Sequence, residues 1–485
     1  MGTIAFSLTS ISTSFRYLNV AKHVRHLYIR PAFLPGLDED VLPEQETIHS
    51  EKRSRKKFGS NERNPTSNNL GSHEEASLVL NLAIEGLKQC TNLQELTIVL
   101  HDHVATPLLL EFLEDLWTGN SIGSNFRRLS VDTTITKIPL IFSLLSKHPK
   151  VLPNFEEVVL EISISRFQHS SADWLAAAES LGSFLKTYQA TVTSLSISSM
   201  TDTDQLGHIF DALPFFQNLK KLEFLAVMNA RTFFNRESLT TFVALHASTL
   251  ENIILKPYPR SATLHQSDSS YTDWLIKEVP ETENRWLSFT QLVFPKVHTL
   301  QIGLVKMHVG LHNHLSILPN GGIAYPPLLP SLSRIAPHLT RLSVIEASLN
   351  LIQVSQIIDV LAVHNGQRIL EELSYSCSTL CLHHFDMLSK MLPRLKSLTI
   401  LYHVAVGENN TGDFTYRGHP GFGLAMEIRC YPTWPVRYLR LLHTSRCGEG
   451  HPYEDDMKIV ASCISSNVVL DTKWTCTCSG PVSDS

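Results

Sequence analysis

The sequence predicts an α/β solenoid, a repeat array with parallel strands on its concave face and helices on its convex face. Three observations predict this fold: a short strand-like segment recurs, a proline stands at a fixed offset before several copies, and the intervals between copies have helical periodicity. The chain has 485 residues, which is longer than a chain that folds around a single hydrophobic core usually is. A repeat array accommodates that length because each unit packs only on its neighbours.

The strand-like segment has an apolar residue, a leucine or similar residue three positions later, and a third apolar residue two positions after that. Polar residues fill most positions between, as expected of a strand with one buried face. Twelve copies occur, and we expect their central residues to point into the core. These residues are Leu27, Leu96, Leu129, Val158, Leu195, Leu222, Ile253, Leu300, Leu342, Leu373, Leu398 and Leu439.

A proline stands five residues before the central residue in four copies, at Pro153, Pro295, Pro337 and Pro393. Proline ends a preceding helix and has no N–H to give to a strand ladder, so it suits the turn that leads into a strand. A shared offset is harder to obtain by chance than the apolar segment itself.

The intervals between copies place apolar residues on one face of a helix. Strand, turn, helix and return therefore make one unit, and neither its strand face nor its helix stripe can be buried without a stacked neighbour. The helical sets are Leu80, Ile84 and Leu87; Leu175, Ala178, Leu181, Leu185 and Tyr188; Leu206, Ile209, Phe210 and Leu213; Leu239, Phe242 and Leu245; and Val354, Ile357, Ile358 and Leu361.

The predicted units are irregular and leucine-rich-repeat-like. Their central residues are 25 to 69 positions apart, whereas leucine-rich repeats are roughly 20–29 residues long. Such repeats carry Asn or Cys three residues after the third apolar position, where the side chain bonds neighbouring turns. Other residue types stand there in this chain, for example His101, Thr134 and Ser163. We expect a looser solenoid without an asparagine ladder and with irregular loops at 258–272, 311–331 and 404–424.

Composition divides the chain into four parts. Residues 1–35 are expected to hold an N-terminal helix and the first repeat strand, residues 75–475 the solenoid, and residues 476–485 a C-terminal tail. Residues 36–74 are polar, acidic and then basic, with too little apolar surface to fold, so they predict a disordered insertion. The basic run 51–58 in this insertion is either a nuclear localisation signal or a solvated linker.

The charge and apolar patterns restrict the partners. The net charge of −5 does not favour nucleic acid or an anionic membrane, and no apolar run reaches the length of a membrane span. Eight cysteines are too few for a disulfide framework in a chain of this length. We expect a cytoplasmic or nuclear protein that is monomeric outside a complex.

The clearest cluster of potential metal ligands is Cys377, Cys381, His383 and His384. The two cysteines fit equally well as small packed hydrophobic residues, and adjacent histidines point to different faces of a helix. The phosphate-binding, nucleophile-elbow and zinc-protease motifs do not occur in the sequence. We therefore expect no catalytic residue, no metal and no cofactor, and we predict that the protein is not an enzyme.

Four segments resemble the repeats of F-box-associated leucine-rich-repeat proteins: LPNFEEVVLEIS (152–163), FPKVHTLQIGL (294–304), APHLTRLSVIEA (336–347) and LPRLKSLTILYH (392–403). Residues 8–31 resemble the end of an F-box passing into a first repeat, as in fungal F-box-like proteins. About 20 residues precede the first repeat, so we expect the F-box to be truncated or absent, with at most its final helix remaining within 4–18. The resemblance implies the substrate receptor of an SCF-type ubiquitin ligase, with the ligase adaptor as a second partner.

Two functions follow as alternatives. The chain is either the substrate-binding part of such a receptor or a stand-alone interaction scaffold with no ubiquitin role; an unrecognised enzyme or zinc protein is a third. For each, the solvent-facing strand residues of the concave face are the candidate protein-binding positions. These are Gln94, Arg128, Ser194, Lys221, Thr299, Arg341, Glu372, Ser397 and Arg440.

Overall fold

The computed structural model describes residues 23–30, 81–163 (except 82, 89 and 102), 169–200, 205–227, 236–257, 274, 289–303, 336–406 (except 362 and 365), 422, 426–443, 454–464 and 468–471. The chain forms two compact units. Unit 1 comprises Met1–Val192 with Ala212–Pro214, and unit 2 comprises Thr193–Asp211 with Phe215–Ser485. The predicted insertion at 36–74 and the C-terminal tail at 476–485 lie outside the described residues.

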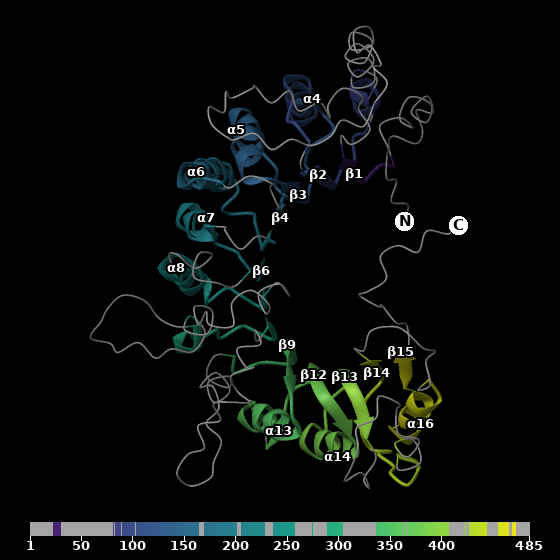
Figure 1. Ribbon diagram of the computed structural model, residues 1–485. Helices are drawn as coiled ribbons and strands as arrows, with labels where there is room; N and C mark the ends of the chain where they lie inside the picture. Colours follow the sequence, from purple (N-terminus) through teal and green to yellow (C-terminus); the bar gives the residue numbers. More distant parts are fainter. Residues whose placement is uncertain are drawn as a thin grey trace, which may run out of the picture. The chain divides into compact units, whose positions relative to one another are not determined.

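Unit 1 has four parallel strands whose order in the sheet follows the chain, with helices along one face of that sheet (Figure 1). The strands are β1 (His26–Ile29), β2 (Glu95–His101), β3 (Arg128–Thr133) and β4 (Glu157–Ile162), and the helices are α4 (Pro107–Thr118), η2 (Ile135–Lys137), α5 (Ile138–Lys147) and α6 (Ser171–Thr187).

Unit 2 continues the same plan with nine parallel strands, again in chain order except for an intervening two-stranded hairpin. The strands are β5 (Ser194–Ser199), β6 (Lys221–Ala226), β7 (Asn252–Pro257), β8 (Thr299–Gly303), β9 (Arg341–Leu349), β12 (Glu372–Cys381), β13 (Ser397–Val406), β14 (Tyr438–His443) and β15 (Val469–Asp471), with the hairpin β10 (Val363–His364) and β11 (Gln367–Arg368). The helices are α7 (Leu206–Ala212), whose last residue belongs to unit 1, α8 (Arg236–His246), η4 (Phe289–Gln291), α13 (Leu351–Val360), α14 (Leu382–Met391) and α16 (Glu454–Ile464).

The twelve predicted central residues are register partners within each unit. In unit 1 Leu27, Leu96, Leu129 and Val158 pair in turn, and in unit 2 Leu195 begins a line of partners that ends at Leu439. All twelve are buried, and the strands alternate between buried and half-exposed residues. The predicted α/β, leucine-rich-repeat-like arrangement of parallel strands with helices on one face is confirmed.

Neighbouring repeats are joined by a ladder of backbone hydrogen bonds at the start of the strands. The carbonyl of Gln94 accepts the N–H groups of both Arg127 and Arg128, at 2.8 and 3.0 Å. The carbonyl of Lys220 accepts in the same way from Glu251 and Asn252, at 2.8 and 2.9 Å. Such a shared carbonyl recurs at Arg25, Arg127, Thr193, Glu251, His298, Thr340, Glu371 and Lys396. Here main-chain bonds connect neighbouring turns, a task that side-chain amides perform in an asparagine ladder.

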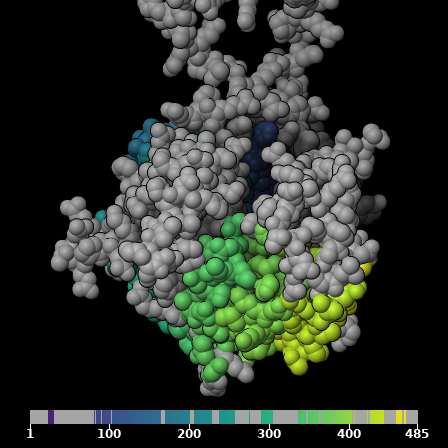
Figure 2. Space-filling view, turned by 60° about the horizontal axis from the view of Figure 1, so that its bottom comes forward, coloured from purple at the N-terminus to yellow at the C-terminus, as the bar shows by residue number. Residues whose placement is uncertain are grey.

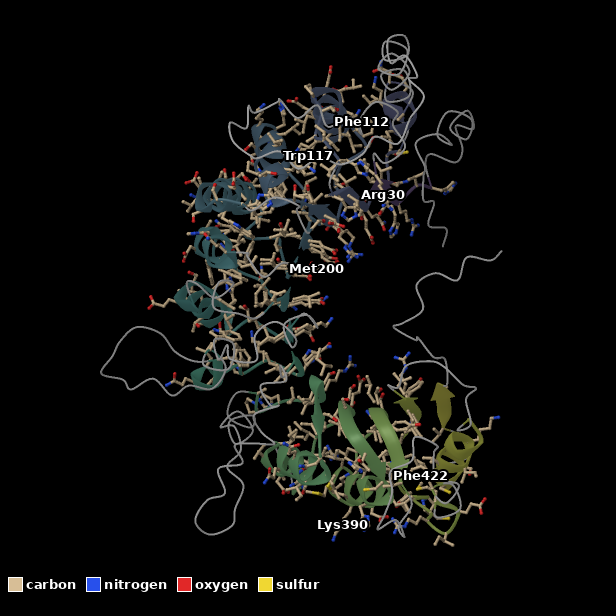
Figure 3. The ribbon with its side chains drawn as sticks, viewed as in Figure 1. Arg30, Phe112, Trp117, Met200, Lys390 and Phe422 are labelled. Atoms are coloured by element: carbon tan, nitrogen blue, oxygen red, sulfur yellow. The ribbon has the colours of Figure 1, made fainter. Side chains whose placement is uncertain are left out.

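An aromatic cluster fills the space between helices and strands in unit 1. Phe126 and Phe155 stack with ring centroids 5.6 Å apart, and Phe184 contacts Phe142 at 5.2 Å. Trp117 closes the cluster in the same layer (Figure 3), and its indole N–H donates to the carbonyl of His148 at 3.0 Å. Large rings bury much apolar area, so this cluster contributes strongly to the stability of unit 1.

Three helices begin where the sequence provides capping side chains. Ser170 and Asp173 form a reciprocal capping box at the start of α6, and Asn350 and Gln353 form one at the start of α13. In α4 the hydroxyl of Thr106 accepts the N–H of Leu109 at 3.3 Å. No apolar set was predicted for α4 or α5, although both are strongly apolar and bury several residues.

Three positional predictions are corrected. Leu175 and Leu245 are exposed (47 and 56%), because α6 and α8 are rotated so that Trp174 and Val243 face the core instead. The loop predicted from residue 404 starts later, since β13 extends to Val406 as a partner of the long strand β12. The short strand β15 pairs with β14 and was missed, because three residues are too few to show periodicity.

Candidate protein-binding face

Each strand turns alternate side chains away from the helices, and we call the surface that they form the open face. The first residues of the strands are register partners and make its first row. In unit 1 that row is His26, Glu95, Arg128 and Glu157. In unit 2 it is Ser194, Lys221, Asn252, Thr299, Arg341, Glu372, Ser397, Tyr438 and Val469.

Seven of the nine predicted binding residues lie in the first row: Arg128, Ser194, Lys221, Thr299, Arg341, Glu372 and Ser397. The placement was wrong for Gln94, which lies in the turn before β2, so that Glu95 occupies the row. Arg440 is on the open face but in the second row, which the third residues of the strands form. Its register partners there are Thr399 and Asp471. Period-two alternation fixes the face of a residue but not its row, which depends on register.

The first row and the turn residues before it form ion pairs between neighbouring strands. His26 lies 3.0 Å from Glu95, and Arg341 lies 3.2 Å from Glu372. Other pairs across adjacent strands or turns are Arg127 with Glu156, Arg128 with Glu157, Lys220 with Glu251, and Lys396 with Glu371. All are partly exposed, so each adds little to stability. Their effect is to place opposite charges side by side on a polar surface.

Glu223 in the second row is the most tightly held carboxylate of this surface. Lys256 of β7 lies 2.9 Å from it and Lys221 of its own strand 3.3 Å. Burial alone would raise the pKa of Glu223, but the hydrogen bond and charge of Lys256, with those of Lys221, lower it below its usual value. The carboxylate therefore stays charged and fixes two lysines on the open face.

A second polar group lies at the far ends of β2, β3 and β4 in unit 1. Asp132 and Glu161 are register partners, and burial followed by the charge of Asp132 raises the pKa of Glu161. Ser163 donates to Asp132, and the Nδ1 atom of His101 is 3.0 Å from the Ser163 hydroxyl oxygen. His101 and Ser163 were predicted only to stand where an asparagine ladder would be. Their proximity follows from the strand ends meeting at one edge of the sheet.

This Ser–His–Asp group does not have the arrangement of a nucleophilic triad. In a triad the histidine stands between serine and aspartate, whereas Ser163 donates directly to Asp132. His101 reaches Asp132 through Nε2 at 3.5 Å, which is longer than a hydrogen bond. Its backbone has a φ of 37°, and β2 shifts register there against β3. The group ties three strand ends together.

The cysteine and histidine cluster lies around the start of α14. Cys377 is buried in β12, and burial, with a smaller effect of Cys381, raises the pKa of its thiol to about 12. Burial lowers the pKa of His384 to about 4, while His383 is exposed. In the described part of the chain no three His, Cys, Asp or Glu side chains come together in a way that could hold a metal ion.

Comparison with known proteins gives a structural likeness and no sequence match. No protein-family model matches the chain, and no curated protein matches it. Among solved structures, the chain is similar to one described as the crystal structure of the Rad7 and Elc1 complex in yeast. The match covers 70% of this chain and 76% of that chain, with 15% sequence identity and a TM-score of 0.32. Of the described helices, none is long and apolar enough to cross a membrane.

Proposed function

We propose that this protein binds another protein through the open face of its parallel strands and performs no chemistry there. The proposal rests mainly on the first row, where half-exposed polar side chains repeat at the spacing of neighbouring strands, about 4.8 Å. Paired charges of both signs suit a protein partner, which offers both signs as well. Nucleic acid would instead favour a continuous basic surface.

For the cellular role, we propose the substrate-binding part of an F-box-like receptor of an SCF-type ubiquitin ligase, acting in the cytoplasm or nucleus. Its support is the resemblance of four repeat segments to F-box-associated leucine-rich-repeat proteins. The ligase adaptor would be the second partner. A stand-alone scaffold uses the same open face without affecting the lifetime of what it binds.

A pair of matched variants tests the binding face. Thr299→Arg places a long cation in the first row, whereas Thr241→Arg makes the same change at an exposed position of α8. Partners recovered with the tagged full chain are identified by quantitative mass spectrometry and then measured with purified protein. We expect Thr299→Arg to weaken binding of the main partner at least about tenfold, a change of about 1.4 kcal/mol. Thr241→Arg should leave it unchanged.

The outcome separates the proposals. Equal binding by both variants would remove the open face as the interaction site. If the face is confirmed, depletion of the protein distinguishes the two roles: a receptor prolongs the half-life of its partner when depleted, and a scaffold does not. Only the receptor role requires that the ligase adaptor be recovered with the wild-type chain.

A further inference from the structure

Two cysteines meet where the segment before β14 contacts α16 in unit 2. The thiol of Cys463 donates to the carbonyl of Met426 at 3.1 Å. The N–H of Tyr431 donates to the carbonyl of Cys463 at 2.8 Å. Cys430 lies between these two contacts, one residue before Tyr431. The side chain of Cys463 is therefore directed at the turn that leads into Cys430.

The backbone bond limits how far apart the two cysteines can be. The nitrogen of Tyr431 is about 2.4 Å from the Cα atom of Cys430, and the carbonyl oxygen of Cys463 is about 2.4 Å from its own Cα atom. Across the 2.8 Å bond, the two Cα atoms are thus at most about 7.6 Å apart. A bend that shortens this path by about 0.8 Å or more brings them into the range of about 4.4–6.8 Å that a disulfide spans.

Electrostatics and exposure agree with this geometry. Burial raises the pKa of Cys463, and the charge of Cys430 adds to the rise, so the two thiols lie within electrostatic range of each other. Cys430 is exposed and Cys463 partly exposed, whereas Cys90 and Cys377 are buried. Figure 2 shows the yellow part of the chain, which includes α16, at the surface beside the green strands and helices of the same unit.

We propose that Cys430 and Cys463 form a reversible disulfide that responds to the glutathione redox state. The Cys430 thiolate attacks oxidised glutathione, forming a mixed disulfide and releasing one reduced glutathione. The Cys463 thiolate then attacks the Cys430 sulfur, which forms the protein disulfide and releases the second glutathione. The two protein thiols lose two protons and two electrons, and the glutathione disulfide accepts them.

The disulfide would regulate the C-terminal end of the sheet in unit 2. The loop that it closes contains β14, which pairs with β15, and α16 directly precedes β15. A cross-link that closes a loop restricts the unfolded chain more than the folded one and so stabilises the fold around it. Oxidation would therefore hold β14 and β15 in place, and with them Tyr438 and Val469 at the end of the first row.

The full chain is equilibrated in glutathione buffers from reducing to oxidising, its thiols are trapped by alkylation, and its peptides are mapped by mass spectrometry. We expect a Cys430–Cys463 linked peptide that disappears on adding dithiothreitol, and a melting temperature several degrees higher in the oxidised protein. Cys430→Ser, at an exposed position, should abolish both effects. A triple variant with serine at Cys447, Cys476 and Cys478 is the matched control and should keep both.

Three results would overturn the proposal. The first is Cys430 linked to a cysteine other than Cys463, the second is Cys430 carrying only glutathione at every redox potential, and the third is no modification of Cys430. Since the mapping follows a covalent bond and not partner binding, its failure leaves the open-face proposal untouched.

Discussion

His384 is a histidine that folding keeps neutral. Its ring is 2% exposed, and Nδ1 accepts the N–H of Cys381 at 3.3 Å, which caps the start of α14. Burial is the main cause of its pKa of about 4, well below the ordinary value of 6.5. The unfolded chain therefore binds a proton that the folded chain excludes, between about pH 6.5 and about pH 4.

Stability should consequently fall with pH in that window. The contribution of His384 is complete above about pH 6.5, is lost progressively as the pH falls to about 4, and changes no further below. The full shift corresponds to at most about 3 kcal/mol. His384→Asn keeps an acceptor for the Cys381 N–H but does not titrate, so urea unfolding of unit 2 should depend less on pH. His383→Asn, at the exposed neighbour, should keep the wild-type slope; equal slopes for all three proteins would contradict the assignment.

Glycine 182 decides how closely α6 can pack. A Cβ atom at Gly182 would lie 2.3 Å from the backbone oxygen of Ala212, which belongs to the same unit, and 3.1 Å from its carbonyl carbon. Backbone atoms cannot rotate away as a flexible side chain can. The position needs a residue without a Cβ atom even though it lies inside a helix, where glycine is normally unfavourable.

Gly182→Ala should therefore destabilise the protein. In a helix interior the substitution usually stabilises by up to about 1 kcal/mol, but here overpacking should cost roughly 1–3 kcal/mol. Ser183→Ala, at the next and exposed position of α6, is the control and should be neutral or slightly stabilising. Midpoints of urea unfolding give the comparison, and a stabilised Gly182→Ala protein would show that the two segments separate readily.

The sequence predicted strands better than helices, for a physical reason. A strand in this fold has its buried residues fixed by register, and all twelve central residues were placed correctly. A helix can rotate on the sheet, so its buried face depends on tertiary packing. The predicted apolar set that included Leu175 identified the helix correctly but placed one edge of its buried face wrongly. Trp174 is buried and Leu175 is exposed, because Trp174 is the larger group to bury.

The candidate binding face was predictable only in part. Alternation identified the side of the strand on which Lys221 and Arg341 lie, but pairing between strands was needed to place Glu95 instead of Gln94 in the first row. Contacts such as that between His101 and Ser163 join residues 62 positions apart, so no local pattern could reveal them. The two neighbouring cysteines at Cys430 and Cys463 belong to the same class of long-range contact.

At the scale of the whole molecule, repeats that contact only their neighbours should lose stability locally. Phe184→Ala removes a ring that contacts Phe142 and Phe155 in unit 1 and should cost about 3–5 kcal/mol there. Hydrogen exchange should accelerate in β3, β4, α5 and α6, while β12 and β13 of unit 2 keep their protection. A uniform acceleration along the chain would instead show that both units unfold together.

The ladder of shared carbonyls has an evolutionary consequence. Each repeat is fastened to the next at the first residue of its strand and the residue before it, as at Arg128 and Arg127, and by the pairing of the strands; the segments between the strands lie outside these attachments. Insertions and deletions elsewhere in a repeat can then be inherited without moving its neighbours out of alignment. In a chain built this way the length of almost every repeat can change during evolution while the spacing of the strands stays fixed. The regular repeat length by which relatives are recognised can then disappear from the sequence.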